Sequence, residues 1–284
     1  MLRYSDLLQV RSPEAEFIWN ERDAILYALA TGFGRDPVNP HELPFVLETA
    51  PLRVVPTFAT VAAWNARPLP ADMQLNLTKL LHSAQSVVLH RPLPARGRVL
   101  GSGRVSGAID KGDKGALIFT ETVLRDASSG VPIVTLLSTL VARGDGHFGG
   151  PTEGAEPRHP IPPRAPDIVA DYPTRPDQAL LYRLCGDHNP IHADPEAAAR
   201  AGFARPILHG LCTFGITCRA VLEHVVNFDE SRIKSHAGRF SSPIIPGDTL
   251  TVELWVDDDI VSFQAKVSDR DAVVLTAGRA KLAQ

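Results

Sequence analysis

Several runs along the chain are rich in apolar and β-branched residues and are broken by short polar turns. They are Val99–Ala108, Ala116–Arg125, Val131–Arg143, Thr249–Val256, Ile260–Ser268 and Val273–Leu282. The breaks are strongly polar, as in Asp257-Asp-Asp and Asp269-Arg-Asp. Runs of this length and composition are typical of strands joined by tight turns. We therefore predict antiparallel strands in both halves of the chain.

One stretch has helical periodicity instead. Its apolar and small residues recur at the spacing of a helix face, and they are Leu211, Phe214, Gly215, Cys218, Leu222 and Val225. Because Pro206 precedes them, the pattern predicts a long helix with Gly210 in its first turn. Shorter helices are predicted to open at Ala24 and at Ala179. Helices followed by antiparallel strands indicate an α+β fold.

A linker is predicted between two halves of similar size. Gly and Pro dominate the segment 144–166, which has no apolar periodicity. The predicted domains are therefore residues 1–143 and 167–284. The halves are weakly similar to each other, since Ala24-Ile-Leu-Tyr-Ala-Leu resembles Ala179-Leu-Leu-Tyr-Arg-Leu, and both continue as a strand, a proline turn and a strand. Two similar units are expected, each a sheet wrapped around a helix, with the sheets continuous.

Composition narrows the class of protein. The 284 residues are 44% apolar and 21% charged, which is ordinary for a globular chain, and the net charge of −3 argues against a nucleic-acid partner. No stretch is long enough to span a membrane, and the N-terminus lacks the apolar core of a signal peptide. The three cysteines, Cys185, Cys212 and Cys218, have no metal-ligand spacing and are expected to be reduced. We expect a cytoplasmic protein.

Candidate chemistry is concentrated between Asp187 and His192. These residues are five apart, too far for one helical face, but Pro190 forces Asn189 out of the α region and bends the chain. A carboxylate and an imidazole that converge on one water form a general acid/base pair. Asn189 would help to fix the water or the carboxylate. The alternative is an ordinary Asx turn in which the polar side chains bond only to their own backbone.

Gly210 is the candidate for stabilising negative charge on a carbonyl oxygen. A first-turn amide has no partner within its helix, and the positive end of the helix dipole favours a developing oxyanion. A glycine also allows close approach to the backbone. Taken alone, Gly210 could equally be a packing glycine.

Together these segments resemble a known family. Tyr182-Arg-Leu-Cys-Gly-Asp-His-Asn-Pro-Ile-His192, Ala201-Gly-Phe203 and Pro206-Ile-Leu-His-Gly-Leu211 are similar to the signature of the MaoC-like hydratase 2 family. The resemblance implies an (R)-specific 2-enoyl-CoA hydratase with a double hot-dog fold. It also implies an acyl-CoA thioester as substrate. No metal or redox cofactor is expected, because the thioester itself activates the double bond.

The resemblance also implies residues that bind coenzyme A. They are His82, Ser83, Lys111 and Phe240, and Ser83 stands where the family has a glycine. Without the resemblance, Lys111 would be a solvated hairpin charge, His82 a core histidine and Phe240 a core residue of a strand. The rest of the motif is expected to line the substrate site, namely His188, Pro190 and Ile191. His209 is expected to be structural, with its side chain directed away from the Gly210 amide.

The first half lacks the catalytic set. Asn39-Pro-His41 has no residue between proline and histidine and no Asp two positions before Asn39. One active site per chain is therefore expected, with the first half making room for the acyl chain.

Asp187 would act as the base and His192 as the proton donor, although a coupled pair can exchange these roles. A hot-dog thioesterase and a non-catalytic acyl-CoA-binding protein remain alternatives. The acyl chain, the pathway and a homodimer stay open.

Overall fold

The structure is a computed structural model, and it describes residues 3–49, 51–68, 71–76 and 79–283. The strands are β1 (Ala15–Trp19), β2 (Leu80–Leu89), β3 (Gly97–Asp110), β4 (Ala116–Asp126), β5 (Pro132–Ala142), β6 (Ile168–Pro173), β7 (Ile233–Phe240), β8 (Thr249–Asp257), β9 (Ile260–Val267) and β10 (Ala272–Leu282). The α-helices are α1 (Tyr4–Leu7), α2 (Glu21–Ala30), α3 (Leu43–Val46), α4 (Ala59–Ala62), α5 (Gln178–Tyr182), α6 (Pro195–Arg200) and α7 (Gly210–His224). Short 3-10 turns are η1 (Pro56–Phe58), η2 (Trp64–Ala66), η4 (Gly112–Lys114), η5 (Arg183–Cys185), η6 (Pro190–His192), η7 (Glu230–Arg232) and η8 (Ser268–Arg270).

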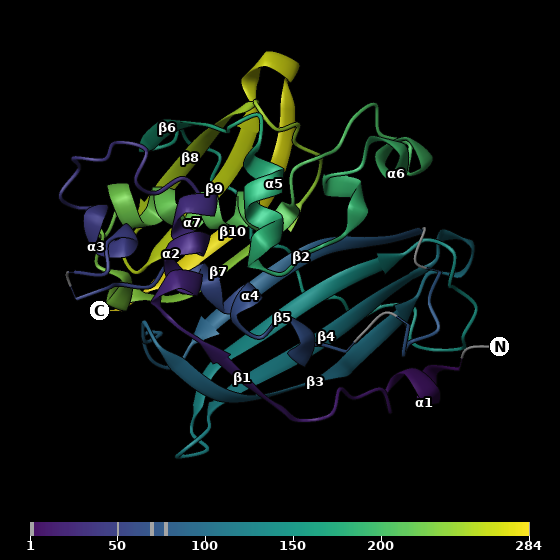
Figure 1. Cartoon of the computed structure of the whole chain (residues 1–284). Helices are drawn as coiled ribbons and strands as arrows, with labels where there is room; N and C mark the ends of the chain where they lie inside the picture. Colours follow the sequence, from purple (N-terminus) through teal and green to yellow (C-terminus); the bar gives the residue numbers. More distant parts are fainter. Residues whose placement is uncertain (1–2, 50, 69–70, 77–78, 284) are drawn as a thin grey trace.

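The ten strands of the described residues form one antiparallel sheet with an internal symmetry. Their order is β1-β3-β4-β5-β2-β7-β10-β9-β8-β6. The second half of this order repeats the first in reverse, with β7 in the place of β2 and β6 in the place of β1. The halves meet where β2 pairs with β7, for example Ala84 with Arg239. This is the continuous sheet of a double hot-dog, and its symmetry is the one that the sequence repeat predicts (Figure 1).

The long helix α7 lies at the centre of the second half. It begins at Gly210, as predicted, and most of its side chains are buried, which is expected of a helix enclosed by a sheet and other helices. Tyr27 of α2 reaches α7 at Gly215, and α5 contacts α2 (Figure 1). A Cβ on Gly215 would lie 2.4 Å from the Thr31 side chain, so this glycine permits the chain after α2 to pack directly on α7. One apolar core therefore spans both halves.

The first half has no helix as long as α7 in the part of the chain that is described. The corresponding space is occupied by α2, α3, η1, α4 and η2. Trp19 of β1, Tyr27 of α2 and Phe58 of η1 help to fill it, and the Phe58 ring meets the other two edge to face at 5.7–5.9 Å. The two halves therefore share the arrangement of their strands but differ in the helices packed on the sheet.

Most predicted elements are present, with differences at their ends. The six predicted strands correspond to β3, β4, β5, β8, β9 and β10. The helix predicted at Ala179 is only α5, which continues as the tight turn η5, while β1 and β6 were not predicted. Residues 144–166 contain no helix or strand. The domain boundaries drawn at 143 and 167 stay a prediction.

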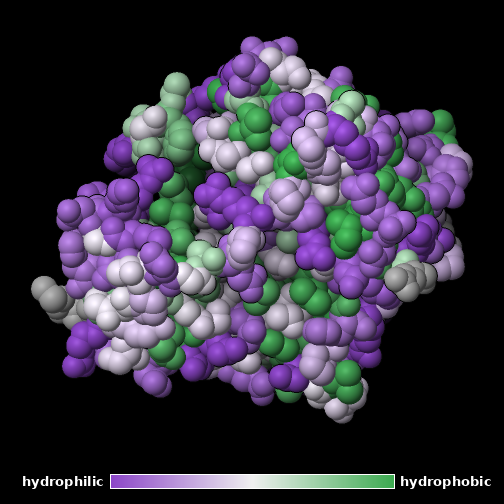
Figure 2. Space-filling model, turned by 180° about the vertical axis from the view of Figure 1, so that it is seen from behind, coloured by the Kyte–Doolittle hydropathy of each residue, from purple (hydrophilic) through white to green (hydrophobic). Residues whose placement is uncertain are grey.

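The structure also bears on three general expectations, which concern the cysteines, membrane-spanning helices and a partner surface. The three cysteines are free thiols, as expected. Among the described residues, no helix combines the length and apolar character needed to cross a bilayer. Figure 2 shows hydrophobic residues interspersed with hydrophilic ones on the face opposite to that of Figure 1. That view does not single out a partner surface, so the homodimer stays a proposal.

Candidate active site

The segment from Asp187 to His192 folds as a tight turn held by its own polar groups. Pro190 opens η6, and Asn189 before it lies outside the α region, with φ of −54° and ψ of 122°. The Asn189 amide donates to Asp187 Oδ1 at 3.1 Å, and the Ile191 amide donates to Asn189 Oδ1 at 3.3 Å. Asn189 therefore fixes the Asp187 carboxylate through its backbone, while its side chain caps the turn.

His192 is buried in a defined orientation. Its Nδ1–H donates to the Ile207 carbonyl oxygen at 2.8 Å. The other ring nitrogen, Nε2, then carries the lone pair in the neutral ring. Burial lowers the pKa of His192 below its ordinary value, while the hydrogen bond to Ile207 and the charge of Asp187 oppose that change. The neutral ring thus presents a proton acceptor next to a carboxylate.

His209 joins these two residues into a cluster. Its ring stacks on that of His192 with 3.7 Å between centroids, and its Nε2–H donates to the Asp187 carbonyl oxygen at 3.1 Å. Burial and the neighbouring His192 lower the pKa of His209 to about 3, so the ring is neutral. The sequence-based interpretation of His209 as structural did not foresee that its ring contacts both candidate catalytic residues.

The same three residues are the ones to consider for a metal ion. One ligand atom each from Asp187, His192 and His209 lies within 4.8 Å of the others. However, the two imidazole planes are stacked at only 26° to each other. Their in-plane lone pairs therefore lie in two stacked, nearly parallel planes and do not meet at one point, whereas a transition-metal ion requires ligands that converge on it. The donor set therefore fits a metal poorly as it stands.

Gly210 supplies a free amide beside the cluster. It is the first residue of α7, directly after the capping residue His209. In the described ranges of the chain, no protein acceptor takes a hydrogen bond from the Gly210 amide. A Cβ on Gly210 would lie 3.2 Å from the Phe240 ring, which leaves a glycine as the residue that fits there without moving the ring. The amide and the helix dipole can together stabilise an oxyanion.

Two predicted coenzyme A residues extend the site across the junction of the halves. His82 of β2 meets Phe240 of β7 edge to face at 5.1 Å, and its Nε2–H donates to the Ala84 carbonyl oxygen at 3.0 Å. Burial and the charge of Arg67 lower the pKa of His82 to about 4. Ser83 is turned to a different partner, since its hydroxyl accepts from Arg239 Nη2 at 3.2 Å. The structure brings together His82 and Phe240, not Ser83.

The remaining predicted residues lie at the rim or farther away. His188 and Pro190 are exposed, and Ile191 is half-buried. Lys111 lies in the hairpin between β3 and β4, where its ammonium group donates to the Thr152 carbonyl oxygen at 2.9 Å. His41 stacks on Phe228, so the Asn39-Pro-His41 segment is a structural turn.

The sequence did not indicate that two further residues lie near the site. They are Trp64, the first residue of η2, and Arg67, which follows the last. The Trp64 side chain lies 3.5 Å from the position of a Cβ on Gly186, the residue before Asp187. The Arg67 guanidinium carbon lies 3.3 Å from the centroid of a Trp64 ring. No motif or periodicity links this segment to Asp187 along the chain, because only the folding of one half against the other brings them together.

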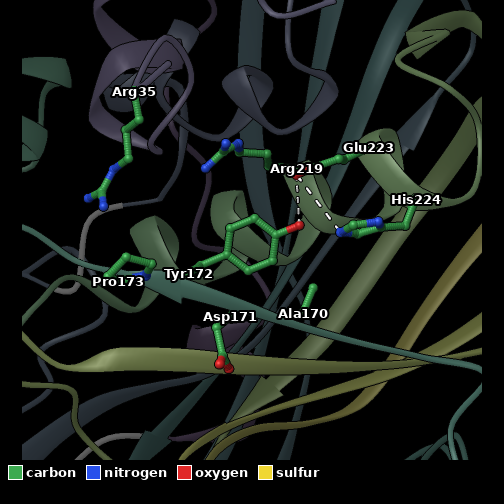
Figure 3. Close-up of a pocket in the computed structure, with 8 residues that line it drawn as sticks. All are labelled: Arg35, Ala170, Asp171, Tyr172, Pro173, Arg219, Glu223 and His224. Carbon is green, nitrogen blue, oxygen red and sulfur yellow. Dashed lines mark hydrogen bonds and ion pairs between the residues drawn. The ribbon is translucent and has the colours of Figure 1, made fainter. Parts of the chain in front are cut away.

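Two cavities lie outside the Asp187–His192 turn. One of about 190 Å³ is lined mainly by Trp19, Phe58, Val61, Ala62 and the residues before the turn, Leu184 and Cys185. The other, of about 270 Å³, lies near the C-terminal end of α7 and is shown in Figure 3. Arg219 and Tyr172 lie side by side there. None of the predicted site residues lines either of these two cavities.

Comparisons with known proteins agree with this geometry. Residues 17–144 match the MFE-2 hydratase 2 N-terminal domain, and residues 159–277 match the MaoC like domain. The enoyl-CoA hydratase ChsH3 of Mycobacterium tuberculosis is 40% identical over 276 residues, which are 95% of each chain. The chain belongs to the MaoC-like hydratase 2 family.

Other members of this family are similar over the same length. The peroxisomal enoyl-CoA hydratase 2 of Arabidopsis thaliana is 37% identical over 288 residues, covering 95% of this chain and 93% of its own. The crystal structure of a MaoC-like dehydratase from Phytophthora capsici superposes with a TM-score of 0.86 at 35% identity, over 99% of this chain and 98% of the other. Membership in the hydratase 2 family therefore applies to both halves.

Proposed function

We propose that the protein catalyses the reversible hydration of trans-2-enoyl-CoA to (3R)-3-hydroxyacyl-CoA. One observation carries this proposal: the side chains of Asp187 and His192 converge beside the free amide of Gly210. Hydration of a conjugated thioester requires both parts, a proton relay for water and a donor for the enolate oxygen. The names of the relatives, enoyl-CoA hydratases from two organisms, support the same reaction.

The reaction is balanced by one water molecule. The thioester oxygen accepts a hydrogen bond from the Gly210 amide, so that C3 becomes electrophilic. The water oxygen bonds to C3 as one water proton passes to the acid/base pair, and the C2–C3 π electrons move to form the enolate. The pair then returns this proton to C2, and the carbonyl is restored. The oxyanion contacts strengthen in the transition state, which is where they accelerate the reaction.

The hydrogen bonds of His192 favour it as the first acceptor of the water proton. With Nδ1–H committed to the Ile207 carbonyl, neutral His192 has a lone pair and no proton at Nε2. It can donate only after it has accepted. This order differs from the initial assignment of Asp187 as the base, in which His192 was the donor. Asp187, fixed by the Asn189 amide, would then orient the water and stabilise the imidazolium.

The finer points of the proposal follow from the chemistry. The thioester provides the activation, so the reaction needs no metal or redox cofactor. The cavity of about 190 Å³ beside the Asp187–His192 turn is the proposed place for the acyl chain, and it is built largely by the first half. A role in fatty-acid or related acyl-CoA metabolism, in the cytoplasm and as a homodimer, completes the proposal.

Purified protein and crotonyl-CoA test the function. We expect the enoyl absorbance to fall without release of free thiol. Release of thiol would instead support a thioesterase, and binding without any change in absorbance would support an acyl-CoA-binding protein. Chiral analysis of the product is a separate test, because a 3S product would overturn the stereochemical part of the proposal.

A further inference from the structure

Arg67 is a cation that stacks on a tryptophan and, among the described residues, forms no ion pair. Its guanidinium group is half-buried against Trp64, with 3.3 Å between the guanidinium carbon and the ring centroid. Within the described part of the chain, no carboxylate or carbonyl oxygen accepts a hydrogen bond from it. A guanidinium group has five N–H donors and is costly to bury without acceptors. Such an arrangement calls for an acceptor from outside the protein.

The backbone that carries Arg67 is fixed on both sides. Toward the sheet, the Ala66 carbonyl oxygen accepts from the Ser12 hydroxyl at 2.6 Å. The next residue, Pro68, fits against Gly103 of β3 so closely that a Cβ there would be 2.6 Å from its ring. Toward the site, Trp64 packs on Gly186. Arg67 is thus presented to the Asp187–His192 turn by a rigid support, as a preorganised binding group requires.

The charge of Arg67 is felt by the groups of the site. Burial lowers the pKa of Arg67 to about 10 and Asp187 opposes that change, so the side chain stays protonated at neutral pH. Arg67 in turn lowers the pKa of His82. Yet Arg67 and Asp187 form no ion pair within 4.0 Å. Trp64, on which Arg67 stacks, packs against Gly186, so the Arg67 guanidinium group is held near Asp187 without pairing with it.

We propose that Arg67 binds a carbonyl oxygen of the pantetheine arm of the acyl-CoA substrate. This inference rests on the proposed function, because Asp187 marks where the acyl carbons react. A group that stacks on Trp64, which packs against the residue before Asp187, lies near the thioester, whereas the phosphates of coenzyme A lie at the far end of the pantetheine arm. The first half thus contributes a substrate-binding residue to the active site of the second half, and the planar stack on Trp64 fixes its direction.

The test compares two substrates and three variants. Crotonyl-CoA and crotonyl-pantetheine, which lacks the nucleotide, are hydrated by the wild type, Arg67→Met and Arg67→Lys. We expect Arg67→Met to raise KM about tenfold to a hundredfold for both substrates, since a hydrogen bond to a charged group is worth roughly 1.5–3 kcal/mol. Arg67→Lys is expected to lie between. Arg98→Met is the matched control, because Arg98 is exposed on β3 and pairs with Glu16.

Each other result overturns the proposal. An unchanged KM would show that Arg67 does not bind substrate, and an increase for crotonyl-CoA alone would place it at the phosphates. Butyryl-CoA, which cannot react, separates this inference from the proposed function, because calorimetry then measures binding in the absence of turnover. Arg67→Met is expected to weaken that binding by the same factor. If Arg67→Met does not fold, the test uses Arg67→Lys, which keeps the charge. Its KM for the two substrates and its affinity for butyryl-CoA are then compared with those of the wild type.

Discussion

At the residue scale, the chemistry of the Asp187–His192 turn depends on which nitrogen of His192 carries the proton. The Ile207 carbonyl oxygen settles this, because a carbonyl can only accept and therefore requires the proton at Nδ1. Ile207 lies in the segment just before α7. The Ile207 amide donates to the Ile191 carbonyl oxygen at 3.3 Å. The proton acceptor and the oxyanion donor are thus set by one short segment, Ile207–Gly210.

A pH profile tests the neutral state of His192. Because its pKa lies below 6.5, the ring stays neutral at pH 7, and protonation on acidification removes the acceptor. We expect kcat/KM to fall on acidification along a limb centred below the ordinary histidine pKa of 6.5. The measurement is the initial rate of crotonyl-CoA hydration at low substrate concentration. An acid limb centred above pH 6.5 would contradict this assignment.

His209 is expected to act by positioning its neighbours. His209→Phe keeps an aromatic ring against His192 but removes the hydrogen bond to the Asp187 carbonyl oxygen. We expect kcat to fall about tenfold with little change in KM, which corresponds to the loss of one hydrogen bond of about 1.4 kcal/mol. His224→Phe, at the opposite end of α7, is the matched control. A loss of affinity with unchanged kcat would contradict a positioning role.

At the element scale, the parts that sequence could predict are those with local signals. Helix α7 and six strands follow from periodicity, and the Asp187–His192 turn follows from Pro190. The strands β1 and β6 are short edge strands whose pairing with β3 and β8 is set by the rest of the sheet. Arg67 and the stacking of His209 on His192 could not be predicted, because they depend on how distant segments fold against each other.

The cavity beside the turn predicts chain-length selection. It opens to the surface at Ile18 and Leu184, which are 70% and 59% exposed. Ala62→Leu adds three methylene-sized groups to a lining residue of a cavity of about 190 Å³. We expect kcat/KM to fall at least tenfold for decenoyl-CoA and to change less than twofold for crotonyl-CoA. Ala170→Leu, which lines the other cavity, should affect neither substrate.

An equal loss with both substrates would contradict the acyl-chain assignment, since it would show that Ala62→Leu distorts the Asp187–His192 turn itself. Ile18→Ser supplies a second comparison at the mouth of the cavity. Because Ile18 is exposed, this change should leave folding intact and reduce turnover of long chains only.

At the scale of the whole molecule, the halves are joined by a buried ion pair as well as by the sheet. Arg219 of α7 lies against the cavity of Figure 3 and pairs with Glu42 of the first half, with Nε–Oε1 and Nη2–Oε1 distances of 3.0 and 2.5 Å. The Glu42 side chain is 1% exposed. Its other oxygen accepts from the Gly34 amide at 2.7 Å, which ties the chain after α2 to the same pair.

Glu42→Gln should therefore destabilise the entire chain. It leaves Arg219 charged and largely buried, and breaking a buried pair from one side costs about 3–5 kcal/mol. We expect a loss of this size in the free energy of unfolding, measured by urea denaturation followed by circular dichroism. Glu121→Gln, which breaks a half-exposed pair with Arg104, should cost less than about 1 kcal/mol. A cost for Glu42→Gln as small as that of the control would contradict a structural role for the pair.

Buried neutral histidines make the folded state sensitive to acid. His236 lies between Phe214 and Phe263 and is fully buried, its Nε2–H donating to the Thr217 hydroxyl, and burial lowers its pKa to about 3. The unfolded chain takes up this proton near pH 6.5 while the folded chain does not. The contribution to stability is complete above pH 6.5 and is lost toward pH 3, at about 1.4 kcal/mol for each pH unit.

His236→Gln removes this titration while retaining an amide donor near Thr217. We expect the variant to be less stable than the wild type at pH 7, but its free energy of unfolding should fall less steeply between pH 6.5 and 5. His90→Gln, at an exposed histidine, is the control and should leave the slope as it is. Because His82 and His209 also have a lowered pKa, part of the slope should persist in His236→Gln. An unchanged slope would show that His236 is not the buried neutral group that the packing implies.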